Sequence, residues 1–213
     1  MKEKPPADDG STEQKILEAA RTVFLRRGTA GARMQEIAEE AGVNQALLHY
    51  YFRSKDRLAA AVFREVAGRL IPGVVQLLGS DAGIEEKVER FVHLYIDTVR
   101  HTPFLPAYVM SELHHHPERL HSVVIEAAGG QASEPQRLLQ LLGTQLRQAA
   151  DAGRIRPIAP EQFLLNLVGL VAAPFLVLPA LQPLFGVDAA AFARLLNERR
   201  AQLPTLILNS LRP

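Results

Sequence analysis

The side chains best suited to bind another molecule lie in one short segment, residues 44–58, which reads NQALLHYYFRSKDRL. Its first half predicts a helix over about 45–51 that is too short and too polar to serve only as core. A glutamine can bond the edge of an adenine, and an alanine can contact the methyl group of a thymine. Imidazole and tyrosine hydroxyl groups can donate to phosphate oxygens. The segment therefore points to contacts with a nucleic-acid duplex.

The spacing within this segment separates residues that hold the helix from residues that face outward. Leu48 and Phe52 lie four residues apart, so both are expected to anchor the short helix to a core. The outward face is then left to Gln45, Ala46, His49 and Tyr50. Lys55 begins the next helix, where its charge and the exposed backbone N–H groups both favour a phosphate.

Two neighbouring helices must hold the segment, and the residues at their ends predict where they begin and end. A helix over about 34–41 ends at Gly42, whose freedom at positive φ permits a tight turn. Asn44 is a good N-cap for the short helix, and Ser54 caps the helix that follows. These elements predict a helix-turn-helix, whose second helix enters the major groove while the first lies across the DNA backbone.

Apolar residues recur with helical periodicity along nearly the whole chain, so the predicted fold class is all-α. A first helix starts at a capping box of Ser11 and Gln14 and ends at Gly28. Pro72 and Gly73 are expected to break the fourth helix. Further helices are expected over about 84–101, 104–113, 120–127 and 138–153, after Pro160, and over 188–211. We expect a disordered arm at 1–11, a DNA-binding domain at 12–58, and a helical ligand-binding and dimerisation domain at 59–213.

Three groups of residues at fixed spacing resemble the TetR family of bacterial repressors, over about residues 12–66. They are Ile37-Ala38, Ala41-Gly42-Val43, and the run LHYYFRSKDRL at 48–58. The resemblance implies a DNA-binding three-helix module joined to a helical, dimeric, ligand-sensing domain. It also implies a palindromic operator as the DNA partner and repression as the usual outcome.

The resemblance further implies roles by position. Base reading falls to Gln45, Ala46 and His49, with help from Arg33, Met34 and Gln35 at the start of the preceding helix. Phosphate contacts fall to Tyr50, Tyr51 and Lys55, and Asn44 belongs to the same DNA-binding segment.

The chain also departs from the family pattern at three places. His49 stands where the family usually has Tyr, and Leu47 where a small or hydroxyl residue is common. Ala32 and Arg33 stand where Thr or Ser usually caps the second helix, so that cap is missing. The operator is therefore not expected to follow from those of better-known members.

The bulk composition limits how DNA could be bound and where. The net charge of the 213 residues is only +1, so binding must come from placed contacts rather than from an excess of positive charge. Cysteine is absent and the first ten residues are polar, which fits a cytoplasmic protein. Residues 163–186 are uncharged and long enough to span a membrane, but Pro174, Pro179 and Pro183 interrupt them. We expect a buried helix or a dimer interface there instead.

Aromatic and apolar side chains of the larger domain are candidates for an effector site. Helical domains bind small molecules between their helices. The candidates are Phe91, Tyr95, Phe104, Tyr108 and Met110. They suggest a small apolar or aromatic effector that releases the protein from its operator. The homodimer is expected to form through residues 138–150 and 163–181, as a four-helix bundle between subunits.

Histidines offer the main alternative to DNA binding. His93, Asp97 and His101 are spaced to share one helix face, as metal ligands would, and His114, His115, His116 and His121 follow. We expect these to be solvated side chains, with no metal and no cofactor bound. No catalytic motif is present, so we expect no enzyme. The alternative function is a helical small-molecule or metal-binding protein without DNA function, and a gel shift would distinguish the two.

Overall fold

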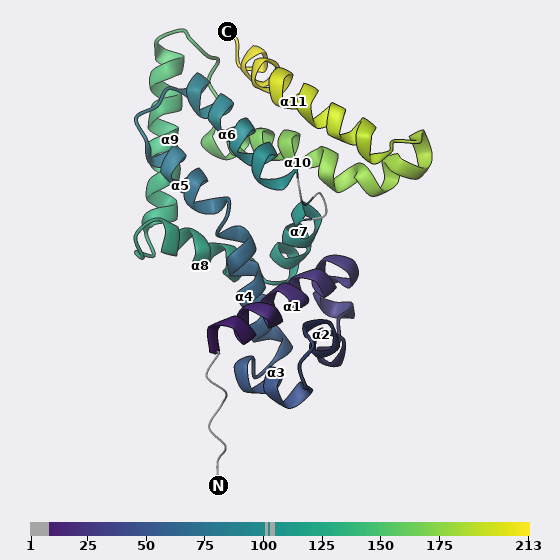
Figure 1. Cartoon of the computed structure of the whole chain (residues 1–213). Helices are drawn as coiled ribbons and strands as arrows, with labels where there is room; N and C mark the ends of the chain where they lie inside the picture. The colour runs from purple at the N-terminus through teal and green to yellow at the C-terminus, as the bar shows by residue number, and fades with distance from the viewer. Residues whose placement is uncertain (1–8, 101, 103–104) are drawn as a thin grey trace. The chain divides into compact units, whose positions relative to one another are not determined.

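The computed structural model describes residues 9–100, 102 and 105–213, and every regular element in that part of the chain is a helix (Figure 1). Contacts divide the chain into two compact units. Residues up to Val66 together with Tyr108–Arg119 form the first, which we call the N-terminal unit. Residues Ala67–Ala107 and Leu120–Pro213 form the second, which we call the helical unit. Residues 1–8 of the arm expected at 1–11, with His101 and Phe104, lie outside the described residues.

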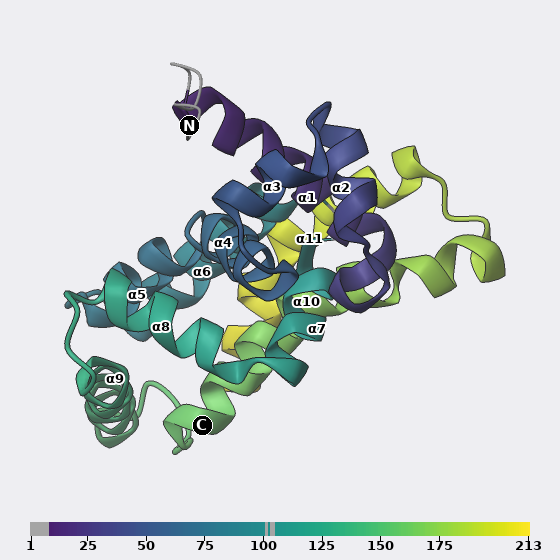
Figure 2. The same cartoon turned by 90° about the horizontal axis from the view of Figure 1, so that it is seen from below.

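The N-terminal unit is built from four consecutive helices and a segment from much later in the chain. The four are α1 (Asp9–Gly31), α2 (Met34–Ala41), α3 (Gln45–Tyr51) and α4 (Lys55–Ala67). The later segment comes from α7 (Leu105–His115) and α8 (Pro117–Ala127), each of which crosses the boundary between the units. Figures 1 and 2 both show α2 and α3 side by side, as their contacts require. The fully buried core of this unit includes Ile16, Ala20, Phe24, Ile37, Leu48 and Leu58.

Local chemistry sets the turn between α2 and α3 and the start of α4. Gly42 ends α2 in the left-handed region, with φ 66°, and the amide of Val43 donates to the carbonyl of Ala38 at 3.0 Å. The Oδ1 of Asn44 accepts from the amide of Leu47 at 2.7 Å, which caps α3 as expected. Ser54 caps α4, since its hydroxyl accepts from the amide of Arg57 at 3.2 Å. Both bounds of α2 and of α3 agree with those expected from the sequence.

The helical unit surrounds one central helix, α6 (Ile84–Val99). This helix contacts α5 (Ile71–Gly79), α9 (Glu134–Asp151), α10 (Pro160–Phe185) and α11 (Ala189–Ser210). Its buried side chains, including Val88, Phe91, Val92, Tyr95, Ile96 and Val99, recur every three to four residues. The break expected at Pro72 and Gly73 comes earlier, because α4 ends at Ala67 and Pro72 lies in the first turn of α5.

Helix α10 continues through the three prolines that were expected to interrupt it. Pro174 has no N–H, so the carbonyl of Leu170 loses its usual helical donor. A guanidinium replaces that donor: Nη2 of Arg199 donates to the Leu170 carbonyl at 2.7 Å. One segment of α10, Pro160–Val177, is long and apolar enough to cross a membrane by length and composition, and 33% of it is buried. The core helix of a soluble protein passes the same test of length and composition.

Candidate nucleic-acid interface

Helix α3 separates its anchoring side chains from its outward face. Leu48 is fully buried and Phe52 is nearly so. The exposed side chains of α3 are those expected to face outward: Gln45, Ala46, His49 and Tyr50. Tyr50 has 61% of its surface exposed, and its ring stands edge-on to that of Tyr51, with 5.4 Å between centroids. An exposed aromatic of this size on a short polar helix is more consistent with a binding surface than with a core.

The start of α2 lies free of any capping side chain. Arg33 is in the N-cap position with an extended backbone, φ −112° and ψ 142°, and its side chain makes no cap hydrogen bond. Arg33 and Gln35 are exposed, whereas Met34 is half-buried. The missing cap inferred from the sequence is therefore found in the structure, and another group must fix this helix start.

Several cations of the N-terminal unit are already engaged. Arg26 pairs with Glu40 at 2.6 Å and Arg27 with Glu36 at 2.8 Å, and both pairs join α1 to α2. Between residues 32 and 58 of the described chain, the exposed cations without an ion pair are Arg33, Arg53 and Arg57. The ammonium of Lys55 donates to the carbonyls of Ala30 at 3.2 Å and Ala32 at 3.1 Å. The sequence predicts that Lys55 contacts a phosphate, but two of the three N–H donors of its ammonium already bond backbone carbonyls.

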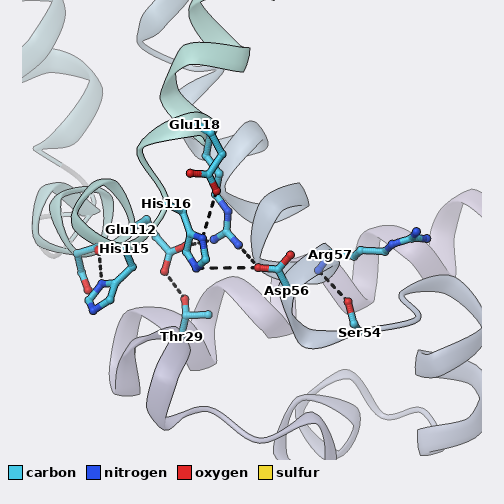
Figure 3. Close-up of polar contacts among 10 residues, drawn as sticks. Thr29, Ser54, Asp56, Arg57, Glu112, His115, His116 and Glu118 are labelled. Carbon is cyan, nitrogen blue, oxygen red and sulfur yellow. Dashed lines mark hydrogen bonds and ion pairs between the residues drawn. The ribbon is translucent and has the colours of Figure 1, made fainter.

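A partly buried polar network, which the sequence did not predict, joins α1 and α4 to the later segment of the same unit (Figure 3). The hydroxyl of Thr29 donates to Oε1 of Glu112 at 2.6 Å. Arg119 bonds both Glu112 and Asp56, and Glu112 and Arg119 are both buried. Breaking such a buried pair costs about 3–5 kcal/mol, so the network fixes Tyr108–Arg119 onto the N-terminal unit.

The histidine run belongs to the edge of this network and shows no ligand-like convergence. His115 bonds the carbonyl of Ser111 at 2.8 Å, and His116 lies 3.2 Å from Glu118 (Figure 3). In the helical unit, Arg200 binds the carboxylate of Asp97, and this hydrogen bond lowers the pKa of Asp97. His101 lies outside the described residues. Within the described residues no three His, Cys, Asp or Glu side chains gather to hold a metal.

The four described candidate effector residues belong to two different units. Phe91 and Tyr95 lie in an aromatic cluster of the helical unit, where Tyr95 is 6.1 Å from Phe175 between ring centroids. Burial raises the pKa of Tyr95 to about 12. Tyr108 belongs to the N-terminal unit and stacks on Phe24 at 6.4 Å, while Met110 is exposed there. Phe104 lies outside the described residues. These aromatics therefore form cores in two different units.

The helical unit contains instead a cavity of about 200 Å³ without a charged side chain in its lining. Four helices supply the lining: α5, α8, α9 and α10. The lining residues are Ile71, Val74, Val75, Leu78, Val124, Pro135, Leu138, Leu139, Leu142 and Leu164. The sequence contained no signal for this cavity, because aliphatic residues around a cavity follow the same periodicity as aliphatic residues in a filled core.

A capped helix-turn-helix with an exposed second helix, followed by a larger helical unit, defines the class of two-unit helical DNA-binding regulators. Residues 16–62 match the sequence profile of the bacterial regulatory proteins of the tetR family. The regulator SrpR of Pseudomonas putida is 31% identical over 155 residues, which cover 73% of this chain and 68% of SrpR. The chain therefore belongs to the TetR family of bacterial regulatory proteins.

Other relatives extend the comparison, with shorter coverage. The regulator BetI of Rhizobium meliloti is 30% identical over 68% of this chain, and the chain spans only 64% of BetI. Among solved structures, the ketosteroid transcriptional regulator KstR2 of Mycobacterium tuberculosis has a TM-score of 0.65 at 15% identity, with 96% of each chain covered. FadR of Bacillus subtilis, solved with stearoyl-CoA, has a TM-score of 0.60 at 18% identity, with 90% of this chain and 97% of FadR covered. Both structural likenesses concern the fold.

Proposed function

We propose that this chain is a cytoplasmic, homodimeric repressor that binds a palindromic DNA operator and leaves it when a small apolar molecule binds the helical unit. The exposed polar face of α3 carries the proposal, since Leu48 and Phe52 hold the helix while its other side chains face outward. Gln45, Ala46 and His49 read base edges in the major groove, with Arg33, Met34 and Gln35 beside them. Asn44 caps the reading helix and fixes its entry.

Phosphate contacts fall to the two tyrosines at the end of α3 and to exposed arginines near it. Tyr50 and Tyr51 offer hydroxyl donors at the end of α3. Arg33, Arg53 and Arg57 are the exposed cations near α3 that lack an ion pair in the described ranges. A few placed cations agree with the net charge of +1, because specificity here rests on geometry and not on a strongly basic surface.

The direct test replaces Gln45 and measures DNA binding to two duplexes. The operator is selected in vitro from a random duplex pool, and a random duplex serves as reference. We expect Gln45→Ala to cost about 1–3 kcal/mol on the operator and to relax one base position, with random-duplex binding unchanged. Gln131→Ala, at an exposed loop position of the helical unit, is the control and should leave both affinities unchanged. If Gln45→Ala lost the same affinity for both duplexes, the result would contradict base reading. If the native chain bound no DNA, the result would favour the alternative, a helical small-molecule or metal-binding protein without DNA function.

The effector site is proposed to be the aliphatic cavity of the helical unit. FadR of Bacillus subtilis was solved with stearoyl-CoA, a molecule with a long alkyl chain. The lining of the cavity offers no partner for a charge, so an uncharged alkyl chain suits it better than a carboxylate. Each buried methylene contributes about 0.8 kcal/mol, which is about a fourfold gain in affinity.

A series of straight-chain alcohols tests this effector class. We expect the concentration that halves operator binding to fall about fourfold per added methylene until the cavity is full. The matching fatty carboxylates should act more weakly. Val74→Phe adds a ring at the cavity wall and should weaken the response to long alcohols while leaving operator binding intact. An unchanged response in Val74→Phe would place the effector elsewhere.

The second copy is proposed to cover an apolar surface of α10 and α11. Leu165 is 69% exposed and Leu206 is 56% exposed, with Leu176 and Val177 also uncovered. Surfaces of this kind on a soluble protein mark interaction sites. Pairing of two copies through these helices would form a four-helix bundle and set two α3 helices about one DNA turn apart, roughly 34–36 Å.

A further inference from the structure

We infer that Lys55 serves DNA recognition as a positioning residue that holds the junction between α1 and α2, and not as a phosphate contact. The inference rests on the proposed DNA-binding function and assigns a different role to one residue of that site. Its ammonium lies 3.2 Å from the carbonyl of Ala30 and 3.1 Å from that of Ala32. The lysine stands at the first residue of α4, so one side chain joins the start of α4 to the end of α1.

The junction needs an external donor because its own residues supply none. The backbone leaves helical geometry at Gly28 (φ 69°, ψ 161°), so Ala30 and Ala32 lie in and just after a single turn, residues 29–31, that follows the kink in α1. Carbonyls at such an end have no intrahelical partner, and the short side chains of Ala30 and Ala32 carry no polar atom. Lys55 therefore satisfies two carbonyls in the place where a favourable capping residue is absent.

The same two bonds fix the beginning of α2. Ala32 is buried and directly precedes Arg33, which holds the uncapped N-cap position. The first hydrogen bond of α2 runs from the amide of Ile37 to the carbonyl of Arg33 at 3.2 Å. Arg33 and Gln35 are exposed side chains of the proposed reading surface, so a loose junction would displace them together.

The residues adjacent to Ala30 and to Lys55 each make a polar contact with the later segment of the same unit. Thr29 precedes Ala30 and bonds Glu112, while Asp56 follows Lys55 and bonds Arg119 (Figure 3). The junction is thus held between two polar contacts of the same unit. A phosphate would have to share the ammonium with two backbone carbonyls, whereas Arg53 and Arg57 carry exposed guanidinium groups nearby in the chain.

The two roles of Lys55 predict opposite results in a salt titration. A lost phosphate contact lowers the slope of log affinity against log salt by about 0.9 and weakens operator and random duplex alike. A lost positioning contact leaves the slope unchanged and weakens the operator selectively. We therefore expect Lys55→Met to keep the salt slope on a random duplex while reducing the ratio of operator to random affinity by about tenfold or more, in line with a loss of about 1.4 kcal/mol.

Arg53→Met is the matched control, because it removes an exposed neighbouring cation without touching the junction. Hydrogen exchange of the free protein supplies a readout that needs no DNA. The amides of residues 29–37 should exchange faster in Lys55→Met and at the native rate in Arg53→Met. A slope reduced by about 0.9 with equal losses on both duplexes would overturn the inference. So would unchanged exchange at 29–37, whereas failure of the native chain to bind any DNA would count against the proposed function alone.

Discussion

At the end of α1 and at the end of α5, a lysine side chain donates to backbone carbonyls that lie at or just beyond the helix end. Lys55 donates to the carbonyls of Ala30 and Ala32 in the N-terminal unit. In the helical unit, Lys87 donates to the carbonyls of Leu78 at 2.7 Å and Ser80 at 2.9 Å. Each ammonium therefore satisfies two backbone carbonyls at or just beyond a helix end.

The two lysines differ in their access to water. Lys55 is half-exposed, whereas Lys87 has only 1% of its surface exposed. Burial lowers the pKa of Lys87, and the nearby charge of Asp81 opposes that shift. The same type of lysine-to-carbonyl contact therefore has two different outcomes. At α5 it fixes a buried turn, and at α1 it leaves a junction that solvent, and in our proposal DNA, can reach.

We expect Lys87 and Lys55 to differ most in what each contributes to the free energy of unfolding. Lys87→Met keeps most of the side-chain volume but leaves the Leu78 carbonyl buried without this donor, while Gln145 still bonds that of Ser80. We expect Lys87→Met to lower the free energy of unfolding by about 1–3 kcal/mol. Lys55→Met should cost less than about 1 kcal/mol, because Lys55 is half-exposed and water can reach the carbonyl of the exposed Ala30. Urea unfolding of both variants measures the two losses, and equal losses would remove the distinction.

Alkaline pH tests the same comparison through protonation. The folded-state pKa of Lys87 lies below its ordinary value of 10.5, so between these two values the unfolded chain binds more protons. Stability therefore rises with pH across that window, and the burial penalty is fully present only below the folded pKa. The gap in unfolding free energy between native protein and Lys87→Met should widen as pH rises toward 10.5. The raised pKa values of Tyr95 and Tyr108 lower the stability of both proteins as pH rises. Their contribution cancels when the unfolding free energy of Lys87→Met is subtracted from that of the native protein.

The sequence predicted the parts of the structure that depend on neighbouring residues. The bounds of α2 and α3 followed from Gly42, from the cap at Asn44 and from the spacing of Leu48 and Phe52. These signals work because each operates within one or two helical turns. The helical class and the outward face of α3 follow from the same local rules.

Contacts between distant residues could not be predicted from one sequence. Arg119 and Asp56 are 63 residues apart, and nothing in either neighbourhood marks the other as its partner. The partners of Lys55 are backbone carbonyls of alanines, which carry no side-chain signal at all. The aromatic candidates for the effector site stay a prediction for a related reason, since a buried aromatic stripe has the same sequence pattern whether it lines a cavity or fills a core.

Arg199 extends the comparison from helix ends to a helix interior. Its guanidinium replaces the N–H that Pro174 lacks, at the carbonyl of Leu170. Arg199→Met should cost about 1 kcal/mol in the native chain. In a Pro174→Ala background the backbone N–H returns, so Arg199→Met should lower the free energy of unfolding by only about 0.3 kcal/mol. Urea unfolding of the four proteins gives the coupling directly. If Arg199→Met costs the same in both backgrounds, the arginine does not act through the Leu170 carbonyl. The rule that long cations replace missing backbone donors would then hold only at the helix ends, where Lys55 and Lys87 lie.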